Sequence, residues 1–347
     1  MSGFAPLHQH SYFSLLDGIA RPVKMAKRCA DLGYSAAALT DHGSISGMVD
    51  YWKAMQKQGV QPIAGCEFYI CGKDEAIKGP ENTRPYAHLV VLAKNRTGWR
   101  DLIRLVSRSN EKDRFYFHPR LALESFREVA SAGNLLAFSG HPGSELANVA
   151  FTNPKAAYAS TTIGALQQFI HPDATKRLRA AAERHVSVFG KGNFFFEIQI
   201  LNPDSMPACQ VVADMLRELS KEMKIPCVAT ADSHYVERRD AIDQRVLLCS
   251  KLRTTMTAVR RRMENEEDVE LGGFFKGDHF HIHSPEEMKR HHKPREIKQS
   301  LLIAEMCEKY DILGQPRLPV MDCPNGMTDV GYLRKLCEDG LARLGDS

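Results

Sequence analysis

Short apolar segments alternate with amphipathic helices along most of the chain, and this alternation limits the folds open to it. Strands separated by helices imply parallel strands joined by right-handed crossovers, in an α/β barrel or an open sheet. We predict strands at 4–8, 35–40, 62–70, 86–93, 134–139, 193–200 and 226–230. We predict helices between them at 21–32, 46–58, 97–109, 173–189, 205–223 and 241–251. About seven such β/α units favour closure into a barrel.

Composition excludes several classes of protein. The 347 residues are 43% hydrophobic and 25% charged, with a net charge of +4, as in a globular protein that permits an anionic ligand. No apolar run approaches the roughly 20 residues that span a bilayer, and the first residues do not resemble a signal peptide. Nine cysteines without C-x-x-C pairs indicate reduced thiols, so we expect a cytoplasmic protein without membrane association.

The pattern changes after residue 252. A charged stretch over 253–270 predicts an exposed loop, and two helical segments at 294–310 and 328–344 follow, with a link between them that contains Pro316, Pro319 and Pro324. We therefore expect two parts: a barrel over 1–252, and a linker with a mostly helical extension over 253–347.

Metal-binding side chains accompany nearly every predicted strand. His8 and His10 are two residues apart, so a strand would place both on one face. A lone His-x-His pair is more often two surface histidines. However, the carboxyl ends of parallel strands gather at one edge, where ligand sites form, and imidazole and carboxylate groups bind zinc, manganese or iron. The chain places the following candidates on strands or at their exits: His8, His10, Asp17, Asp41, His42, Glu67, His88, His141, Asp232 and His234.

Five of these runs together resemble the PHP (polymerase and histidinol phosphatase) domain, of the type at the N-terminus of the bacterial DNA polymerase III α-subunit. They are Leu7-His8-Gln9-His10-Ser11, Ser14-Leu15-Leu16-Asp17-Gly18, Leu39-Thr40-Asp41-His42-Gly43, Gly65-Cys66-Glu67 and Ala231-Asp232-Ser233-His234-Tyr235. Residues 115–120 and 284–288 extend the resemblance, which covers the whole chain. It implies a distorted seven-stranded (β/α) barrel with up to three divalent metal ions.

The resemblance also implies a distribution of ligands. His8, His10 and Asp232 would hold the first metal, and Glu67 would bridge it to a second. His88 and His141 would complete the second site, and Asp17, His42 and His234 would form the third. Many replicative relatives have lost some ligands, whereas every position here keeps a competent residue. We predict three ions of zinc, manganese or iron, with Glu67, His42 and Asp232 as catalytic residues.

A site of this kind would hydrolyse phosphoesters. The resemblance implies a 3′→5′ exonuclease of the proofreading type, acting on single-stranded DNA or a primer terminus, with other replication proteins as possible partners. The chain has no Pro-Asp-x-Asp-x-Asp run, so no polymerase active site is expected, and its end resembles the approach to a polymerase palm. A metal-stabilised scaffold and a phosphatase for a small phosphomonoester remain alternatives.

Further side chains are candidates for contacts with substrate. Arg120 follows an aromatic run over 115–117, and an arginine fork with stacking rings could hold DNA, although the loop could equally pack on itself. We predict Arg120, Lys94 and Tyr116 as substrate-binding residues. The alternating His279, His281 and His283 fit the polar face of an edge strand better than a second metal site. The acidic run over 264–270 fits a solvated loop.

Overall fold

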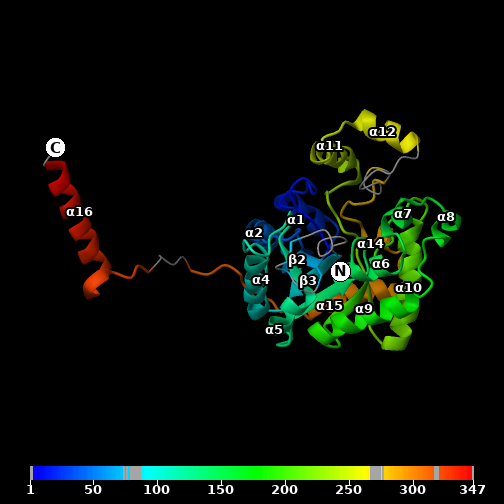
Figure 1. Ribbon diagram of the computed structural model, residues 1–347, viewed down its shortest axis with the longest axis horizontal. Helices are drawn as coiled ribbons and strands as arrows, with labels where there is room; N and C mark the ends of the chain where they lie inside the picture. The colour runs from blue at the N-terminus through cyan, green and yellow to red at the C-terminus, as the bar shows by residue number, and fades with distance from the viewer. Residues whose placement is uncertain are drawn as a thin grey trace. The chain divides into compact units, whose positions relative to one another are not determined.

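The computed structural model describes residues 3–72, 75, 77–78, 87–265, 275, 277–315 and 320–345 (Figure 1). The chain divides into two compact units, Met1–Ile312 and Leu313–Ser347. The smaller unit contains a short 3₁₀ turn, η3 (Pro324–Gly326), and the helix α16 (Asp329–Gly345), which buries none of its residues. The larger unit continues past residue 252, where we predicted that the barrel ends. That boundary between barrel and extension therefore stays a prediction.

One curled sheet of seven strands forms the centre of the larger unit (Figure 1). Its order is β1 (Ala36–Leu39), β2 (Gln61–Cys71), β3 (Ala87–Ala93), β5 (Leu135–Ser139), β6 (Phe194–Ile198) and β7 (Cys227–Ala229), with β4 (Arg120–Ala122) paired to β2. The α/β class and a seven-stranded sheet are thus confirmed. Six of the seven predicted strands form, whereas β4 was not among the predictions. The sheet is not wholly parallel as predicted, because β3 runs antiparallel to both β2 and β5. An antiparallel pair does not need the crossover helix that joins two parallel strands.

The N-terminal segment joins the two edges of this sheet. Residues 4–8, predicted as a strand, are extended but form no regular strand. On one side the backbone N–H of Ala38 in β1 donates to the carbonyl of Pro6 at 2.9 Å. On the other side the N–H of His10 donates to the carbonyl of Ser233, beyond β7, at 2.7 Å. The segment therefore places its histidines between the first and last strands of the sheet.

Helices cover the sheet, and seven of the eight predicted ones are confirmed with ends within two residues of the prediction. The long helices are α1 (Pro22–Asp31), α2 (Met48–Lys57), α4 (Arg96–Ser109), α9 (Ala174–Phe189), α10 (Pro207–Met223), α11 (Ala241–Lys251) and α15 (Pro294–Glu305). The last of these ends five residues before its predicted end. The shorter helices are α5 (Arg127–Ala130), α6 (Glu145–Val149), α7 (Pro154–Ala159), α8 (Ile163–Gln167) and α14 (Pro285–Met288). Two 3₁₀ turns also belong to this unit, η1 (Leu123–Phe126) and η2 (Arg238–Asp240).

The charged stretch over 253–270 is not the loop that we predicted. Its first part forms the helix α12 (Met256–Glu264), and the Thr255 side chain accepts a hydrogen bond from the N–H of Ala258 at 3.2 Å. This cap satisfies one of the free donors in the first helical turn, so a sequence rich in arginine can continue as a helix. Residues 266–270 of the acidic run lie outside the described residues.

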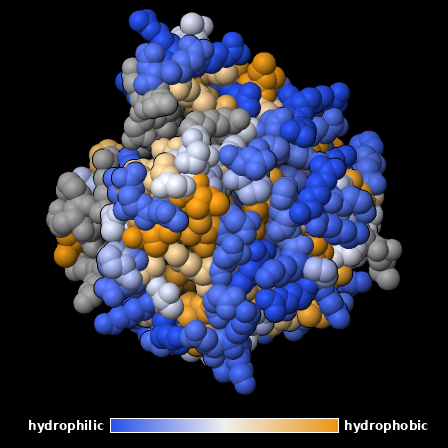
Figure 2. Space-filling model, turned by 90° about the vertical axis from the view of Figure 1, so that its right-hand side faces the viewer, coloured by the Kyte–Doolittle hydropathy of each residue, from blue (hydrophilic) through white to orange (hydrophobic). Residues whose placement is uncertain are grey.

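Apolar side chains are concentrated inside the larger unit. The central strands are buried on both faces, as expected where helices cover a sheet, and Trp52, Phe68 and Phe138 are among the largest fully buried side chains. The face in Figure 2 is mostly hydrophilic and carries only scattered apolar areas. Among the described residues, no helix combines the length and the apolar character needed to cross a membrane.

A buried ion pair attaches α15 to the barrel. The guanidinium of Arg217 on α10 donates to both carboxylate oxygens of Glu296 on α15, at 2.7 and 2.9 Å, and both residues are buried. Two parallel hydrogen bonds compensate the cost of removing these charges from water. The pair therefore makes residues 294–305 part of the barrel unit, although they follow its predicted end.

We predict that Glu296→Ala lowers the free energy of unfolding by about 3 kcal/mol, because it removes the buried partner of Arg217 and leaves that charge paired only with the exposed Asp214. Urea denaturation would measure this loss. The exposed pair between Arg127 and Glu124 is a matched control, and Glu124→Ala should change the stability far less. Equal effects of the two substitutions would contradict a stabilising role for the buried pair.

Candidate metal centre

All nine predicted ligands meet at one end of the barrel, from seven separate parts of the fold. His8 and His10 come from the N-terminal segment, and the other ligands lie on strands β2 and β3 or in the loops around them. The loop ligands are Asp17 before α1, His42 after β1, His141 after β5, and Asp232 and His234 after β7. Most of these side chains are buried, and the residues lie up to 226 positions apart in the sequence. Their convergence is therefore a property of the fold and not of local sequence.

Glu67 on β2 is the centre of the cluster. Its Oε2 atom lies 2.7 Å from Nδ1 of His42 and 3.3 Å from Nε2 of His10. Its Oε1 atom lies 2.8 Å from Nε2 of His141 and 3.1 Å from Nδ1 of His88. The residue is 2% exposed. Nε2 of His8 lies 3.6 Å from Oε2 as well. One carboxylate therefore faces five imidazoles, three on Oε2 and two on Oε1, which is the arrangement expected of a bridging ligand.

A second carboxylate faces the N-terminal histidines. Oδ1 of Asp232 lies 3.4 Å from Nε2 of His8 and 3.2 Å from Nε2 of His10. Asp232 has a φ of 45°, in the left-handed region that residues other than glycine rarely adopt. Such a backbone is held by the surrounding structure and is frequent at functional sites. These three side chains form one group with ligand atoms within 4.8 Å of one another.

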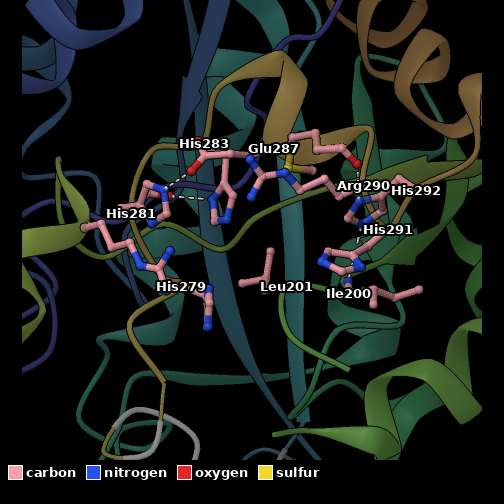
Figure 3. Close-up of a pocket in the computed structure, with 11 residues that line it drawn as sticks. Ile200, Leu201, His279, His281, His283, Glu287, Arg290, His291 and His292 are labelled. Atoms are coloured by element: carbon pink, nitrogen blue, oxygen red, sulfur yellow. Dashed lines mark hydrogen bonds and ion pairs between the residues drawn. The ribbon is translucent and has the colours of Figure 1, made fainter. Parts of the chain in front are cut away.

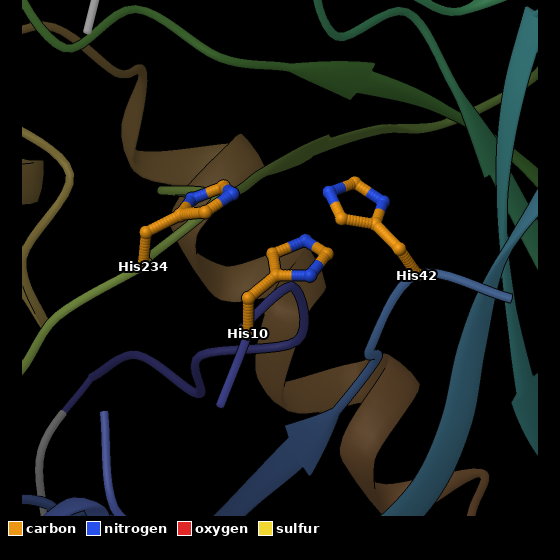
Figure 4. A group of neighbouring side chains, drawn as sticks. All are labelled: His10, His42 and His234. Atoms are coloured by element: carbon orange, nitrogen blue, oxygen red, sulfur yellow. The ribbon is translucent and has the colours of Figure 1, made fainter. Parts of the chain in front are cut away.

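The remaining ligands lie around Asp17. Its two carboxylate oxygens lie 3.7 Å from Nε2 of His42 and 3.9 Å from Nε2 of His234. Figure 4 shows His42 and His234 directed toward His10 from different parts of the chain, and these three histidines form a second compact group. Asp17 also accepts a 3.0 Å hydrogen bond from the ammonium group of Lys251 at the end of α11. The sequence analysis did not identify this lysine.

Several polar atoms of the cluster are buried without hydrogen bonds, and this tests whether the residues fit metal ions. Within the described part of the chain they include Asp17 Oδ1, His42 Nδ1, Glu67 Oε2, His141 Nε2 and Asp232 Oδ1. Nδ1 of His42 and Oε2 of Glu67 are only 2.7 Å apart, yet their orientation does not make a hydrogen bond. Buried polar groups without partners are costly, whereas a bound cation would satisfy them. The donor set of imidazoles and carboxylates therefore fits zinc, manganese or iron.

A second layer of side chains orients these ligands. The sequence analysis did not identify its main member, Glu197. Glu197 on β6 is fully buried, and its two oxygens lie 2.7 Å from Nδ1 of His8 and 2.7 Å from Nδ1 of His141. The hydroxyl of Thr230 donates to the same carboxylate at 2.7 Å. Both imidazoles thus donate through Nδ1 and keep Nε2 for a metal. The available sequence signal was a single glutamate within the apolar strand 194–198.

Two glycines give the backbone room near the ligands. A Cβ atom on Gly18 would overlap the carbonyl oxygen of Ser11, so the turn that follows Asp17 requires glycine. Gly140 has a φ of 146°, and a side chain there would overlap the carbonyl of Glu197. The glycine in this position lets the chain pass close to β6 immediately before His141.

The charges of the cluster perturb its histidines in opposite directions. Burial alone would lower the pKa of His10, but the neighbouring carboxylates of Asp232 and Glu67 outweigh it and raise the pKa to about 9. The pKa of His141 is likewise raised to about 9, because Glu197 and Glu67 outweigh burial. Burial instead lowers the pKa of His42 to about 4, since Glu67 opposes it only in part. Metal-free protein at neutral pH thus carries protons on some ligands and not on others.

The predicted substrate-binding residues do not gather at this cluster. Arg120 is 1% exposed, and its guanidinium donates to backbone carbonyls of Arg114, Glu75 and Ile77, with the Tyr116 ring beside it. These bonds join the guanidinium to its own loop and to the segment that contains Glu75 and Ile77, and they leave no surface that a phosphate could reach. The sequence could not indicate this, because two of the three acceptors lie 45 and 43 positions away.

Lys94 lies away from the cluster because of the direction of β3. His88 is near the start of this antiparallel strand, whereas Lys94 follows its end, where its ammonium group contacts Asn193 at 3.4 Å.

The aromatic loop reaches the ligands through another residue. His118 stacks on Tyr69 at 4.4 Å between ring centroids, and Tyr69 in turn packs against His88 at 5.0 Å.

The fold and this cluster define an α/β half-barrel with a candidate metal centre of histidines and carboxylates. Residues 6–200 match the PHP domain model, and the chain belongs to the PHP family. It is 33% identical over 352 residues to the DNA polymerase III subunit alpha of Thermus aquaticus, covering 98% of this chain and 26% of that protein. The corresponding subunit of Treponema pallidum is 29% identical, with 97% and 26% covered. The chain thus spans about a quarter of the length of these relatives.

A solved structure also resembles the chain, at a lower level. It is a two-domain protein from Bacteroides vulgatus described as containing a predicted PHP-like metal-dependent phosphoesterase. The likeness has a TM-score of 0.35 and 16% sequence identity, and it covers 67% of this chain and 53% of that protein. The family assignment rests on the sequence match and not on this likeness.

We predict that Glu197→Gln weakens zinc binding by about 10- to 100-fold, because an amide cannot accept hydrogen bonds from both His8 and His141. Competition with a chromophoric chelator would measure the affinity. The control is Glu218→Gln on the exposed face of α10, which should leave the affinity unchanged. Equal affinities for the two variants would exclude an orienting role for Glu197.

We also predict that zinc binding at pH 7 releases protons, because His10 and His141 carry protons in the metal-free protein and must lose them to bind a metal. The release should fall as the pH rises through about 9, where these groups are already deprotonated. Calorimetry in buffers with different ionisation enthalpies counts the protons. A binding enthalpy that does not depend on the buffer at pH 7 would contradict the raised pKa values.

Proposed function

We propose that the chain is a metal-dependent phosphoesterase that hydrolyses DNA from the 3′ end. The observation that supports this most strongly is the convergence of nine ligand-competent side chains around Glu67, several with buried polar atoms that lack hydrogen bonds. A purely structural metal site is usually closed by four ligands, whereas this cluster has more donors than one ion needs.

The ligands would divide among three ions as the family resemblance implies. His8, His10 and Asp232 would hold one ion, and Glu67 would connect it to a second held with His88 and His141. Asp17, His42 and His234 would hold the third. Divalent ions in these positions would supply Lewis acidity toward a phosphate group and activate water at neutral pH.

The protein itself would set the protonation and orientation of the site. Glu197 fixes which nitrogen of His8 and His141 faces the centre, and Lys251 neutralises one oxygen of Asp17. Burial keeps the imidazole of His42 neutral at pH 7. We propose Glu67, His42 and Asp232 as the catalytic residues because each lies where two groups of ligands meet.

The relatives favour DNA as the substrate. The matched proteins are DNA polymerase III α-subunits, so we infer a 3′→5′ exonuclease that acts on single strands or primer ends, alongside other replication proteins in the cytoplasm. The nine ligands all lie before residue 253, so we propose that residues 1–252 carry the activity and that 253–347 link it to further structure.

The test is metal-dependent release of nucleotides from 3′-labelled single-stranded and mismatched primer DNA by the whole chain. We predict activity with Mn²⁺ or Zn²⁺ that a chelator abolishes, and loss of activity to background in Asp232→Asn. Asp204→Asn, which changes an exposed loop, should keep the wild-type rate.

Two other outcomes would point to the alternatives. Bound metal with a raised melting temperature but no turnover would indicate a scaffold. Faster hydrolysis of p-nitrophenyl phosphate and small phosphate esters than of DNA would indicate a phosphomonoesterase. Either result would contradict the proposed exonuclease.

A further inference from the structure

A polar cavity lies beside the metal centre, and none of the predicted metal ligands lines it. It is lined by Ile200 and Leu201 after β6, Arg238 of η2, and the segment from 279 to 292 (Figure 3). Five histidines and two arginines line it, together with Glu287. The lining histidines are His279, His281, His283, His291 and His292.

The histidines reach this cavity because of strand alternation. Residues 279–283 are extended and run beside the chain that carries the ligand His234, whose N–H donates to the carbonyl of Phe280 at 2.7 Å. Phe280 and Ile282 are buried on the inner side, where the Phe280 ring lies 6.1 Å from the His234 ring. The alternate residues therefore face away from the metal centre. They line a cavity, and are not the polar face of an edge strand as the sequence suggested.

The histidines of this cavity are not arranged to hold a metal ion. Among the described residues, the groups of ligand atoms close enough to share an ion all belong to the main cluster. Nδ1 of His283 is hydrogen bonded to the carbonyl of His281 at 2.9 Å. Both nitrogens of His292 lie about 3.1 Å from backbone carbonyls, of Met288 and Ile198. These contacts direct the imidazole nitrogens to the backbone and not to a common point.

The charges favour an anion instead. The carboxylate of Glu287 is already satisfied, because it accepts from the backbone N–H of Ser284 at 2.7 Å and from Nε2 of His281 at 3.1 Å. By contrast, the guanidinium of Arg290 makes no hydrogen bond or ion pair within the described part of the chain. The guanidinium of Arg238 is already paired with Asp278, at 2.8 and 2.9 Å. Because Nε2 of His281 donates to Glu287, its buried Nδ1 is an acceptor, so the free donors of the cavity belong to Arg290.

The size of the cavity suits a phosphate group. Its volume is about 60 Å³, and a water molecule needs roughly 10–15 Å³ on the same measure. The space therefore holds four or more atoms of that size, close to the five heavy atoms of a phosphate. Arginine binds such a group through two parallel hydrogen bonds.

We propose that this cavity is a phosphate-binding subsite, with Arg290 as its principal cationic group. Its position one strand away from His234 suits a second phosphate of the same nucleic-acid strand whose end lies at the metal centre. The assignment to a nucleic-acid strand rests on the proposed function, whereas the binding of phosphate itself does not. The site would then hold the strand by its backbone, independently of sequence.

The test begins with inorganic phosphate and the whole chain freed of metal by a chelator. Calorimetry should detect binding that Arg290→Gln weakens at least about tenfold. Lys289→Gln is the matched control, because it removes the same charge from the neighbouring residue, which does not line the cavity, and it should change binding less than about twofold. Equal losses in the two variants, or no phosphate binding by the wild type, would overturn the proposal.

A second arm separates a nucleic-acid phosphate from free phosphate. Fluorescence anisotropy with a labelled single-stranded oligonucleotide should show weaker binding by Arg290→Gln than by Lys289→Gln. If Arg290→Gln weakens the binding of inorganic phosphate but not of the oligonucleotide, the phosphate subsite stands and its assignment to the nucleic-acid strand is overturned. His8→Ala should lose hydrolysis and keep phosphate binding, so that failure of the exonuclease proposal and failure of the subsite can be told apart.

Discussion

The contact of the Glu67 carboxylate with five imidazoles is the interaction on which the site depends. A buried carboxylate is costly unless it is paired, and here the histidines come from β3, from the N-terminal segment and from loops after β1 and β5. The cluster therefore forms only when the sheet has curled and the N-terminal segment has joined its edges. Folding and assembly of the metal centre are one process in this chain.

The chain builds the centre in two layers. The inner ligands lack hydrogen bonds at several atoms, while the outer groups are fully engaged: Glu197 with His8 and His141, and Asp41 with Ser14, which contacts His10. Orienting groups of this kind commonly set the affinity of a metal site as strongly as the ligands do. Parts beyond the matched residues 6–200 complete the arrangement, since they supply Asp232, His234 and Lys251.

Much of this could be predicted from the sequence, for physical reasons. Strand exits gather at one edge, so ligands such as His42 and His141 could be assigned to one cluster from strand positions alone. Other features had no sequence signal. The antiparallel direction of β3 is visible only in the pairing of the folded strands, and the burial of Arg120 depends on the carbonyl of Glu75, 45 positions away. Glu197 is one acid among phenylalanines, and its partners are visible only in three dimensions.

The most direct test of the metal centre is anomalous diffraction from crystals of the whole chain, recorded at the zinc and manganese absorption edges. The account predicts ions bound by Nε2 of His8 and by the Glu67 carboxylate, with Glu197 hydrogen bonded to the imidazoles and not to a metal. It would be contradicted by the absence of ions in metal-saturated crystals. A single ion held by Glu197, with Glu67 bonded only to protonated histidines, would contradict it equally.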